Sequence, residues 1–438
     1  PLEPPAPRAR SHGVRAGGLI TVPVKVSITP DRLPADDERF LAVPVVASLP
    51  VVFVDQYGAD LEDPLHRRIG ETRPLRRLLA PRADRAADKQ QLVDIRHIRP
   101  EQLDRAILED ARLVVIAGIA DPGGAVPILR QFVERGGHLV IAAGGTLDPS
   151  SNAGFDASRW MATAWRDGAG ILPAPLLPEP LGATPDEVAG TDLTAFSLAF
   201  DSLSADQVFR LAGISRQRMQ DLYAEPLFFK AVRVDDSARA LQPLLKSRSD
   251  RTEPSLPRTL AKLDEPANTP YLVTRRMGRG TVLFVASGLR PEWNTLATTN
   301  AMLIFDRILR QMILSTLPRR NFESSEPVVL LLPDAQPNLA VTVSRPEQPD
   351  YREVLDTEWS RDARDRLRIH RPWKRGFYRI AADRLDPPGG GESGQPVWTT
   401  TLAVNGPAEE SDLRSLSQQE LATQMDGTHA FWVGHRDE

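Results

Sequence analysis

The sequence predicts an α/β protein in which a doubly wound parallel sheet is flanked by antiparallel β-sandwich pieces. Two observations support this prediction. In the middle of the chain, short apolar runs such as PVVFVD and ARLVVIAGI alternate with segments of helical length, and strands joined by helical crossovers form parallel sheets. Toward both ends of the chain, apolar residues recur at every second position, which is typical of strands with one buried face.

Residues 1–48 are predicted to contribute two strands. In TVPVKVSI, Val22, Val24, Val26 and Ile28 alternate with polar residues or proline, and RFLAVPVV follows a turn-rich segment. This alternation predicts one face in a core and one in water. Because a two-stranded hairpin is only marginally stable alone, we expect these strands to complete an immunoglobulin-like sandwich begun upstream or to pack on another part of this chain.

Residues 49–322 are predicted to form the α/β domain. Its first strands are PVVFVD, QLVDI, ARLVVIAGI and HLVIAAGG, and its helices include PEQLDRAILED and AVPILRQFVERGG. Later, YLVTRRMGRGTVLFVAS is predicted to be a hairpin that turns at GRG, and TLATTNAMLIFDRILRQMILSTL a long amphipathic helix. Between HLVIAAGG and this hairpin, proline-rich and polar segments from about residue 150 to 270 predict an insertion or cap on the sheet.

Residues 323–408 are predicted to form a second, immunoglobulin-like sandwich. Five short strands with turn signals between them, among them VVLLLP, LAVTVSRP and WTTTLAVNG, support this prediction. Tyr378 in GFYRI is a candidate tyrosine corner, which is a packing device. Residues 409–438 are predicted to form a helical tail.

The composition limits the classes of function. With 438 residues, of which 41% are hydrophobic and 26% charged, the chain is long enough for two or three globular domains. The formal net charge of -4 and the lack of a long basic run argue against nucleic-acid binding. The chain has no cysteine, which excludes disulfides, thiolate metal sites and cysteine nucleophiles. No run approaches the 18 apolar residues of a membrane-spanning helix.

The candidate cleft residues follow the predicted strands, because an open α/β sheet binds ligands at the carboxyl ends of its strands. They are Asp55, Gln56, Asp121, Gly123, Ala143, Gly144 and Ser287. Two interpretations of Asp55 and Asp121 are open. Either they pair over a cleft as acid and base or hold a cation, or each caps a helix or closes a turn, for which the sequence DPGG is well suited.

Other motifs give little support for a cofactor or a metal. The sequence contains no phosphate-binding loop and no dinucleotide fingerprint, and its seven histidines form no metal-binding pattern. We therefore predict no cofactor and no metal site. A basic group around GET either docks an acidic partner or a phosphate, or forms a solvated face balanced by nearby acids. Its members are Arg67, Arg68, Arg73, Arg76 and Arg77.

The α/β segments resemble the class I glutamine amidotransferase-like fold. LVVIAGIADPGG matches that family's glycine-containing loop, AVPILRQFVERGG the following helix, and HLVIAAGG the strand that carries the nucleophile. In this register Ala143 stands where the nucleophilic cysteine is expected, and Ala286, Ser287 and Gly288 stand where the histidine is expected. A methyl group cannot attack a carbonyl. The resemblance therefore implies a degenerate domain without the Cys-His-Glu triad, and not an enzyme.

The order of segments along the chain resembles the extracytoplasmic region of BatA-type bacterial membrane proteins, which are aerotolerance-operon-like and contain a von Willebrand A domain. The segments are DRLPADDERFLAVPV, GET, FVERGGHLVIAAGG, WRDGAGILPAPL, MGRGTVLFVASGLRPEWNTL and LAVNGPAEESDLRSLSQQEL. The resemblance implies a periplasmic position and membrane and von Willebrand segments outside these residues. It also implies protein partners among von Willebrand A-type membrane proteins and MoxR-type ATPases.

The leading hypothesis is a noncatalytic protein-interaction or scaffold region of a membrane-anchored envelope protein. One alternative is a hydrolase that uses Asp55, Asp121 or Ser287. Another is a module that binds carbohydrate or a small ligand beneath the insertion, where Trp160, Trp165 and Trp293 either stack on a sugar or pack the insertion onto the sheet. Convergence of Asp55, Asp121 and a His or Ser in an open pocket would favour an enzyme, whereas filling of the region around Ala143 by side chains from the insertion would make catalysis untenable.

Overall fold

The chain forms two compact units in the computed structural model. One unit comprises Val46–Leu317, and the other combines Ile20–Val45 with the chain from Pro318 onward. The structure describes residues 20–29, 37–81, 92–146, 154–188, 193–246, 255–331, 339–345, 348–355, 357–359, 366–369, 373–384, 396 and 398–407. The predicted helical tail, 409–438, lies outside the described residues. No helix in the described ranges combines the length and the apolar character that crossing a membrane would require.

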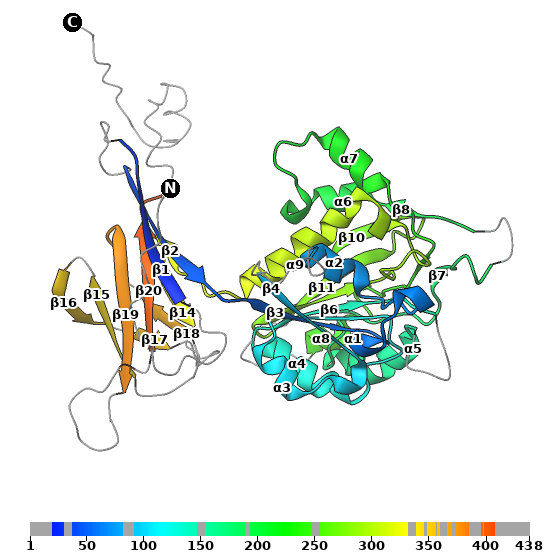
Figure 1. Ribbon diagram of the computed structural model, residues 1–438, viewed down its shortest axis with the longest axis horizontal. Coiled ribbons are helices and arrows are strands. Elements are labelled where there is room, and N and C mark those ends of the chain that lie inside the picture. The colour runs from blue at the N-terminus through cyan, green and yellow to red at the C-terminus, as the bar shows by residue number, and fades with distance from the viewer. Residues whose placement is uncertain are drawn as a thin grey trace, which may run out of the picture. The chain divides into compact units, whose positions relative to one another are not determined.

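The first unit is built on a mixed eight-stranded sheet (Figure 1). Its parallel strands are β3 (Leu49–Val54), β4 (Val93–Ile98), β5 (Leu113–Ala117), β6 (His138–Ala142) and β12 (Gly280–Val285). The neighbours β11 (Pro270–Met277), β10 (Arg258–Asp264) and β8 (Ser197–Leu198) continue it by antiparallel pairing. Numbered by sequence, the parallel strands lie in the order 2-1-3-4-5, an order of doubly wound sheets. The predicted hairpin is β11 and β12, joined at Gly278 and Arg279.

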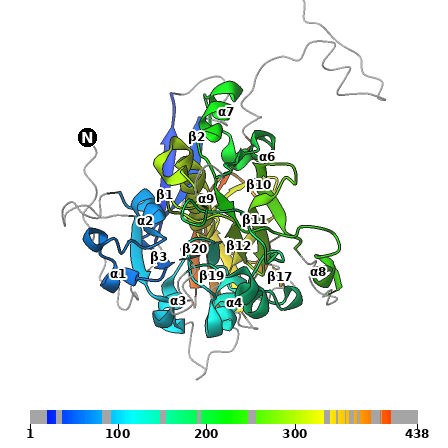
Figure 2. The same cartoon turned by 90° about the vertical axis from the view of Figure 1, so that its right-hand side faces the viewer.

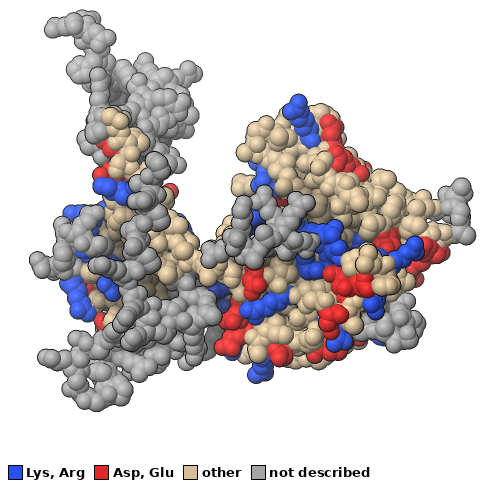
Figure 3. All heavy atoms as spheres, viewed as in Figure 1, with Lys and Arg blue, Asp and Glu red and all other residues tan. Residues whose placement is uncertain are grey.

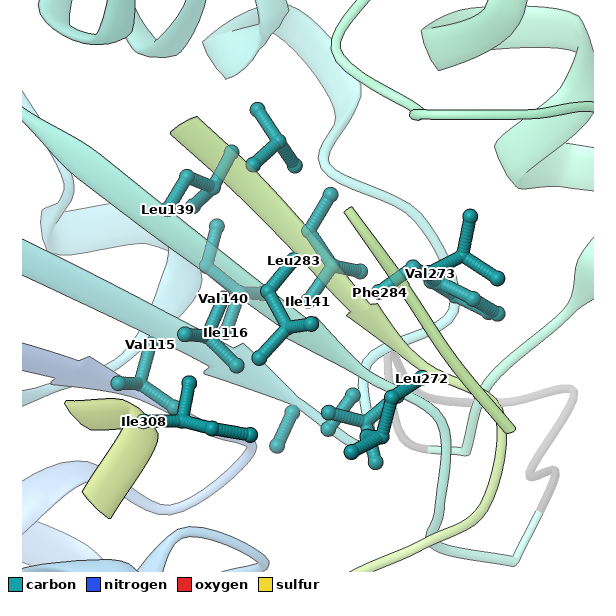
Figure 4. Close-up of a cluster of buried hydrophobic side chains, with 14 of the residues drawn as sticks. Val115, Ile116, Leu139, Val140, Ile141, Leu272, Val273, Leu283, Phe284 and Ile308 are labelled. Carbon is teal, nitrogen blue, oxygen red and sulfur yellow. The ribbon is translucent and has the colours of Figure 1, made fainter. Parts of the chain in front are cut away.

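Helices cover both faces of this sheet. Figures 1 and 2 show α2 (Arg73–Leu79) and α9 (Leu303–Ser315) on one face, and α3 (Arg105–Asp110) and α4 (Val126–Glu134) on the other. Because both faces are covered, β5 and β6 are buried along their whole length, which explains their continuous apolar sequences. Figure 4 shows this core, in which Val140 and Ile141 of β6 lie beside Leu283 and Phe284 of β12.

Short elements connect β6 to β10. They are α5 (Ala157–Trp160), the π-helical turn Met161–Trp165, β7 (Leu181–Gly182), α6 (Phe200–Ser204), α7 (Arg216–Ala224), β9 (Lys230–Ala231) and α8 (Gln242–Lys246). Before β4 the chain also forms α1 (Gly58–Leu61). The predicted insertion of residues 150–270 is wrong in two places, because β8, in its middle, and β10, near its end, belong to the sheet.

The second unit contains a β-sandwich. One sheet has the order β13 (Asn321–Glu323), β20 (Trp398–Asn405), β19 (Gly376–Arg384), β15 (Leu339–Arg345) and β16 (Gln348–Val354); the other has β14 (Val328–Leu331), β18 (Arg366–Ile369) and β17 (Thr357–Trp359). Leu367 of one sheet and Val341 and Ile380 of the other belong to one buried apolar cluster. Tyr378 forms the expected corner, since its hydroxyl donates to Lys374 O at 2.8 Å and accepts from Lys374 N at 3.1 Å.

The N-terminal hairpin, β1 (Ile20–Ser27) and β2 (Glu38–Val45), packs on this sandwich. Phe40 and Ala42 form a small cluster with Ala403 and Phe377. The Asn405 side chain bonds both backbone groups of Phe40, each at 2.8 Å. Packing on another part of the chain is therefore the alternative that the structure shows. The segments predicted as separate domains, 1–48 and 323–408, contribute to one unit, with boundaries at 45/46 and 317/318.

The expected burial of β1 is wrong. Its alternating apolar residues were predicted to face a core, but Val22, Val24 and Val26 are exposed, as is Ile28 just after the strand. The reason is that the side chains that contact the sandwich, Phe40 and Ala42, lie on the other face of the hairpin.

Candidate functional site

A buried glutamate, Glu71, lies across the carboxyl edge of the sheet. It precedes α2, and its exposure is 0%. Its Oε1 accepts the N–H groups of Leu289 at 2.6 Å and Arg290 at 3.2 Å, and its Oε2 accepts that of Gly145 at 3.1 Å. Because these donors follow β12 and β6, the carboxylate occupies the edge at which open α/β sheets bind ligands.

Three glycines, one after each of β5, β6 and β12, make room for Glu71. A Cβ atom on Gly144 would lie 2.3 Å from Glu71 Oε1, one on Gly288 would lie 2.9 Å from the same oxygen, and one on Gly118 would lie 2.9 Å from Glu71 Cγ. Gly118 and Gly144 have φ of +63° and +122°, which glycine adopts without steric cost. We call Gly118, Gly144 and Gly288 the glycine cradle.

Burial raises the pKa of Glu71 to about 7. The N–H groups of Leu289 and Arg290 and the charge of Arg290 favour the ionised form, but they offset only part of this effect. The carboxyl group therefore changes its charge near neutral pH.

Trp293 covers the same edge. Its ring is 3% exposed, and its Nε1 donates to Gly145 O at 2.9 Å. Lys230 Nζ lies 5.1 Å from the centre of that ring. The side chains that fill this region are thus Glu71 and Trp293, both of which lie outside the predicted insertion of residues 150–270.

A second buried carboxylate, Asp55, directly follows β3. Its Oδ1 lies 2.9 Å from His97 Nε2, and its Oδ2 accepts from Thr72 N at 3.1 Å and from Thr72 Oγ1 at 2.6 Å. Burial alone would raise its pKa, but the hydrogen bond and charge of His97 and the bonds from Thr72 outweigh burial and lower it to about 2. Asp55 therefore stays ionised and holds the ends of β3 and β4 to the start of α2.

The charges continue from His97 to α2. His97 Nδ1 lies 3.9 Å from Glu62 Oε2, and Arg76 Nη2 donates to both oxygens of Glu62 at 2.7 and 2.8 Å. Arg73 Nη1 lies 3.6 Å from Glu62 Oε1. Within the predicted basic group, these arginines are balanced by a nearby acid. Figure 3 shows basic and acidic side chains interspersed on the visible face of this unit.

The GET segment joins the two carboxylates. A Cβ atom on Gly70 would lie 2.3 Å from Asp55 Oδ2, so glycine is required there. Glu71 enters the glycine cradle, and the next residue, Thr72, binds Asp55. Each residue of GET is therefore needed at its position for a different contact.

The other predicted cleft residues have local roles. Asp121 Oδ1 accepts from Gly123 N at 2.6 Å, which is the turn-closing interpretation. Ser287 is fully buried; its Oγ donates to Lys230 O at 2.8 Å and accepts from Asn294 Nδ2 at 2.9 Å.

Two further predicted positions complete this set. The buried Ala143 donates its N–H to Val285 O at 3.0 Å. Gln56 Oε1 is buried without a hydrogen-bond partner among the described residues.

These residues do not converge in an open cleft. The pairing of Asp55 with Asp121 is not observed, because His97 and Thr72 bind Asp55, and Gly123 binds Asp121. Among the described residues, no group of three or more His, Asp or Glu side chains suits a metal ion. A cavity of about 600 Å³ lies nearby, lined by residues that include Ile69, Arg73, Arg77, Arg290 and Met302, but by neither Asp55 nor Glu71.

The tryptophans proposed to stack on sugar are buried. Trp160, Trp165 and Trp293 are 0%, 6% and 3% exposed. Trp160 stacks on Phe155 with ring centres 5.2 Å apart and donates to Ile119 O at 3.1 Å. The packing interpretation of these rings is the one that the structure supports.

Sequence reasoning missed Glu71 and His97. Both are remote in sequence from the groups that they bind: Glu71 lies 218 residues from Leu289, and His97 lies 42 residues from Asp55. One available signal was a glycine after each of three strands, which indicates a bulky group above the sheet edge. Another was a histidine next to the last residue of β4, the strand that follows Asp55 in the sequence.

The fold and the site define a class of protein: a mixed α/β protein in which a side chain of the chain itself, the Glu71 carboxylate, closes the carboxyl edge of the sheet. Neither a protein family nor a curated protein matches the sequence. Similar solved structures include the cytoplasmic protein STM1381 of Salmonella typhimurium LT2 (10% identity, 67% of this chain and 96% of that chain covered, TM-score 0.35). The cytoplasmic protein STM3548 of Salmonella typhimurium has 12% identity, coverage of 60% and 97%, and a TM-score of 0.37.

A beta-galactosidase from Bacillus circulans sp. alkalophilus is also similar, with 10% identity, coverage of 82% of this chain and 40% of that chain, and a TM-score of 0.30. At these TM-scores the similarities assign no function.

Proposed function

We propose that this chain is a noncatalytic protein-interaction or scaffold region built on a degenerate amidotransferase-like α/β domain. The observation that carries the proposal is the closure of the sheet edge by Glu71. Its carboxylate takes three backbone N–H groups and fills the glycine cradle. A substrate carbonyl would need the same donors and the same space.

The neighbouring side chains supply no nucleophile with a base. Ala143 presents a methyl group, and Ser287 donates its hydroxyl proton to a backbone carbonyl. Acyl transfer requires a nucleophile within reach of a base. Asp55 and His97 are bonded to each other and buried, so the hydrolase alternative has less support.

The order of segments along the sequence supports a cellular setting. By its resemblance to BatA-type proteins, we place the region outside the cytoplasm, in the periplasm, tethered to the inner membrane by segments outside these residues. Its partners are then von Willebrand A-type membrane proteins and MoxR-type ATPases.

Two measurements test this proposal. The purified chain should bind a MoxR-type ATPase or a von Willebrand A-type membrane protein from the same genome, saturably, in an equilibrium binding assay. It should not hydrolyse glutamine, a p-nitrophenyl ester or a p-nitrophenyl glycoside faster than these compounds hydrolyse in buffer alone. Asp121→Ala and Gln56→Ala test whether any turnover comes from the sheet edge, where both residues lie. The proposal would be refuted by turnover that either substitution abolishes, or by binding to neither of the two partners.

A further inference from the structure

One face of the β1–β2 hairpin is an exposed apolar surface. Its members, which we call the hairpin patch, are Ile20, Val22, Val24, Val26, Ile28, Leu41, Val43 and Val45, and they are 36–61% exposed. They are eight of the seventeen exposed large apolar side chains among the described residues. Exposed apolar side chains that are scattered singly need no explanation, whereas a contiguous patch marks an interaction surface.

The register places these side chains on the same face. Ile20 pairs with Val45, Val22 with Val43, and Val24 with Leu41. Directly opposed residues of an antiparallel pair project from one face, and so do alternate residues of a strand. The patch is therefore continuous across both strands.

Charged side chains are kept away from the patch. Lys25 pairs with Phe40 and Glu38 pairs with Ser27, so both side chains belong to the face opposite the patch, where they form an ion pair of 2.7 Å. Arg39 opposes Val26, but its Nη1 donates to Gly406 O at 3.0 Å, which draws the guanidinium toward the sandwich. An apolar face is best matched by another apolar face, because a charge set against it would be desolvated without compensation.

The inner face anchors the hairpin. Phe40 contacts Phe377 edge to face, with ring centres 5.2 Å apart. Asn321 accepts from Ala42 N at 2.8 Å and donates to Ala42 O at 3.1 Å. The hairpin is thus held on one side while the patch on the other side stays open.

The edge of the hairpin is less suited to pairing than its face. Pro23 lies in the middle of β1, opposite Ala42. Proline in an edge strand removes a backbone donor and disfavours the addition of another strand. A partner is therefore expected to pack on the face, as one sheet of a sandwich packs on another.

We propose that a second copy of this chain covers the hairpin patch, through a two-fold contact between the two identical patches. Among the described residues, the patch itself is the one exposed β face with this apolar character. Eight side chains about half exposed offer on the order of 600 Å² per copy, close to the roughly 800 Å² per partner of a standard interface. Two-fold symmetry is the commonest form of self-association and requires a self-complementary surface. This proposal goes beyond the proposed function and does not depend on it.

Sedimentation equilibrium of the full chain tests the proposal. The wild-type chain should be a dimer at micromolar concentration. Val22→Lys combined with Val43→Glu places opposite charges on directly opposed residues, which preserves the hairpin while charging the patch. We expect this variant to dissociate at least about 100-fold more readily. Val354→Glu is the matched control, because Val354 is 71% exposed and lies outside the patch; it should leave the dimer unchanged.

Crosslinking gives a second measurement that does not require a charged variant to fold. The chain has no cysteine, so Val43→Cys introduces a single thiol within the proposed contact. Under mild oxidation Val43→Cys should form a covalent dimer, whereas Val354→Cys should not. A wild-type chain that remains monomeric at about 100 μM, a dimer that survives the charged substitutions, or equal crosslinking of the two cysteine variants would overturn the proposal. None of these outcomes bears on catalysis by the α/β unit.

Discussion

Asp55 and Glu71 are buried to the same extent at one edge of one sheet, yet their pKa values move in opposite directions. Both carboxylates are 0% exposed. Burial raises the pKa of Glu71 to about 7, whereas the His97 and Thr72 bonds overcome burial and lower that of Asp55 to about 2. The partners differ: both carboxylates accept backbone N–H groups, but Asp55 also has a histidine and a hydroxyl as side-chain partners, which Glu71 lacks. The nature of the donors, more than the degree of burial, separates the two sites.

Opposed pKa values are a property of acid and base pairs in enzymes. Here neither carboxylate lines the neighbouring cavity, and the two are joined through adjacent residues, Glu71 and Thr72. We therefore interpret the pair as a clamp. Asp55 fixes the segment before α2 to β3 and β4, and Glu71 fixes the same segment to the loops after β6 and β12.

The largest expected effect comes from closing the glycine cradle. Gly144→Ala would set a Cβ atom 2.3 Å from Glu71 Oε1 at a residue with φ of +122°. Strain and overpacking together should lower the free energy of unfolding by roughly 3–5 kcal/mol, measured by urea denaturation. Glu71→Ala should relieve part of this loss in the double variant. Strictly additive losses would show that Glu71 does not fill the cradle.

Asp55→Asn should have the next largest effect. It leaves His97 and Thr72 without an ionised partner, which should cost roughly 3–5 kcal/mol of stability at neutral pH. The folded pKa, about 2, lies below the ordinary value of 3.8. The stabilisation is therefore complete above about pH 4 and is lost as pH falls toward 2.

The variant should lack this acid-dependent loss. Asp121→Asn is the control, because Asp121 bonds only a turn N–H and should change stability by less than about 1 kcal/mol. An equal loss in the two variants would contradict the structural role of Asp55.

Glu71→Gln should give a pH dependence of the opposite sign. The folded pKa of Glu71, about 7, lies above the ordinary value of 4.5. The wild-type chain therefore binds more protons when folded, and it loses stability as pH rises from about 4.5 to 7. Relative to the wild type, the Gln variant should gain about 2–3 kcal/mol over this range, measured by denaturation at successive pH values. A flat difference would show that the backbone N–H groups fully offset burial.

The strands could be predicted from the sequence, whereas the closure of their edge could not. β3, β5, β6 and β12 each contain a continuous apolar run, because burial on both faces leaves a local signature. The candidate edge residues Asp55, Ala143 and Ser287 follow directly from those strand ends. Glu71 has no such signature, because a glutamate in a short polar segment resembles a surface residue until loops 74 and 218 residues away supply its donors.

The hairpin shows the same limit in another form. Alternation in β1 indicated a strand with an apolar face, but alternation does not say what covers that face. The anchoring groups, Phe377 and Asn405, lie more than 300 residues away in sequence. Only the assembled sandwich decides which face of the hairpin is buried.

The smallest expected effect on the free energy of unfolding comes from placing a thiol at position 143, where the resemblance to amidotransferases expects the nucleophile. Ala143→Cys adds one sulfur atom at a fully buried site and should cost about 1 kcal/mol. It should confer no hydrolysis of glutamine, because Glu71 holds the N–H groups that an oxyanion would need. In the native protein its thiol should react with a thiol reagent far more slowly than that of Leu65→Cys, since Leu65 is 92% exposed. Glutamine hydrolysis, or equal labelling of the two thiols, would mean that Glu71 leaves the sheet edge readily. Asp55 and Glu71 would then differ in mobility, with Asp55 fixed and Glu71 movable.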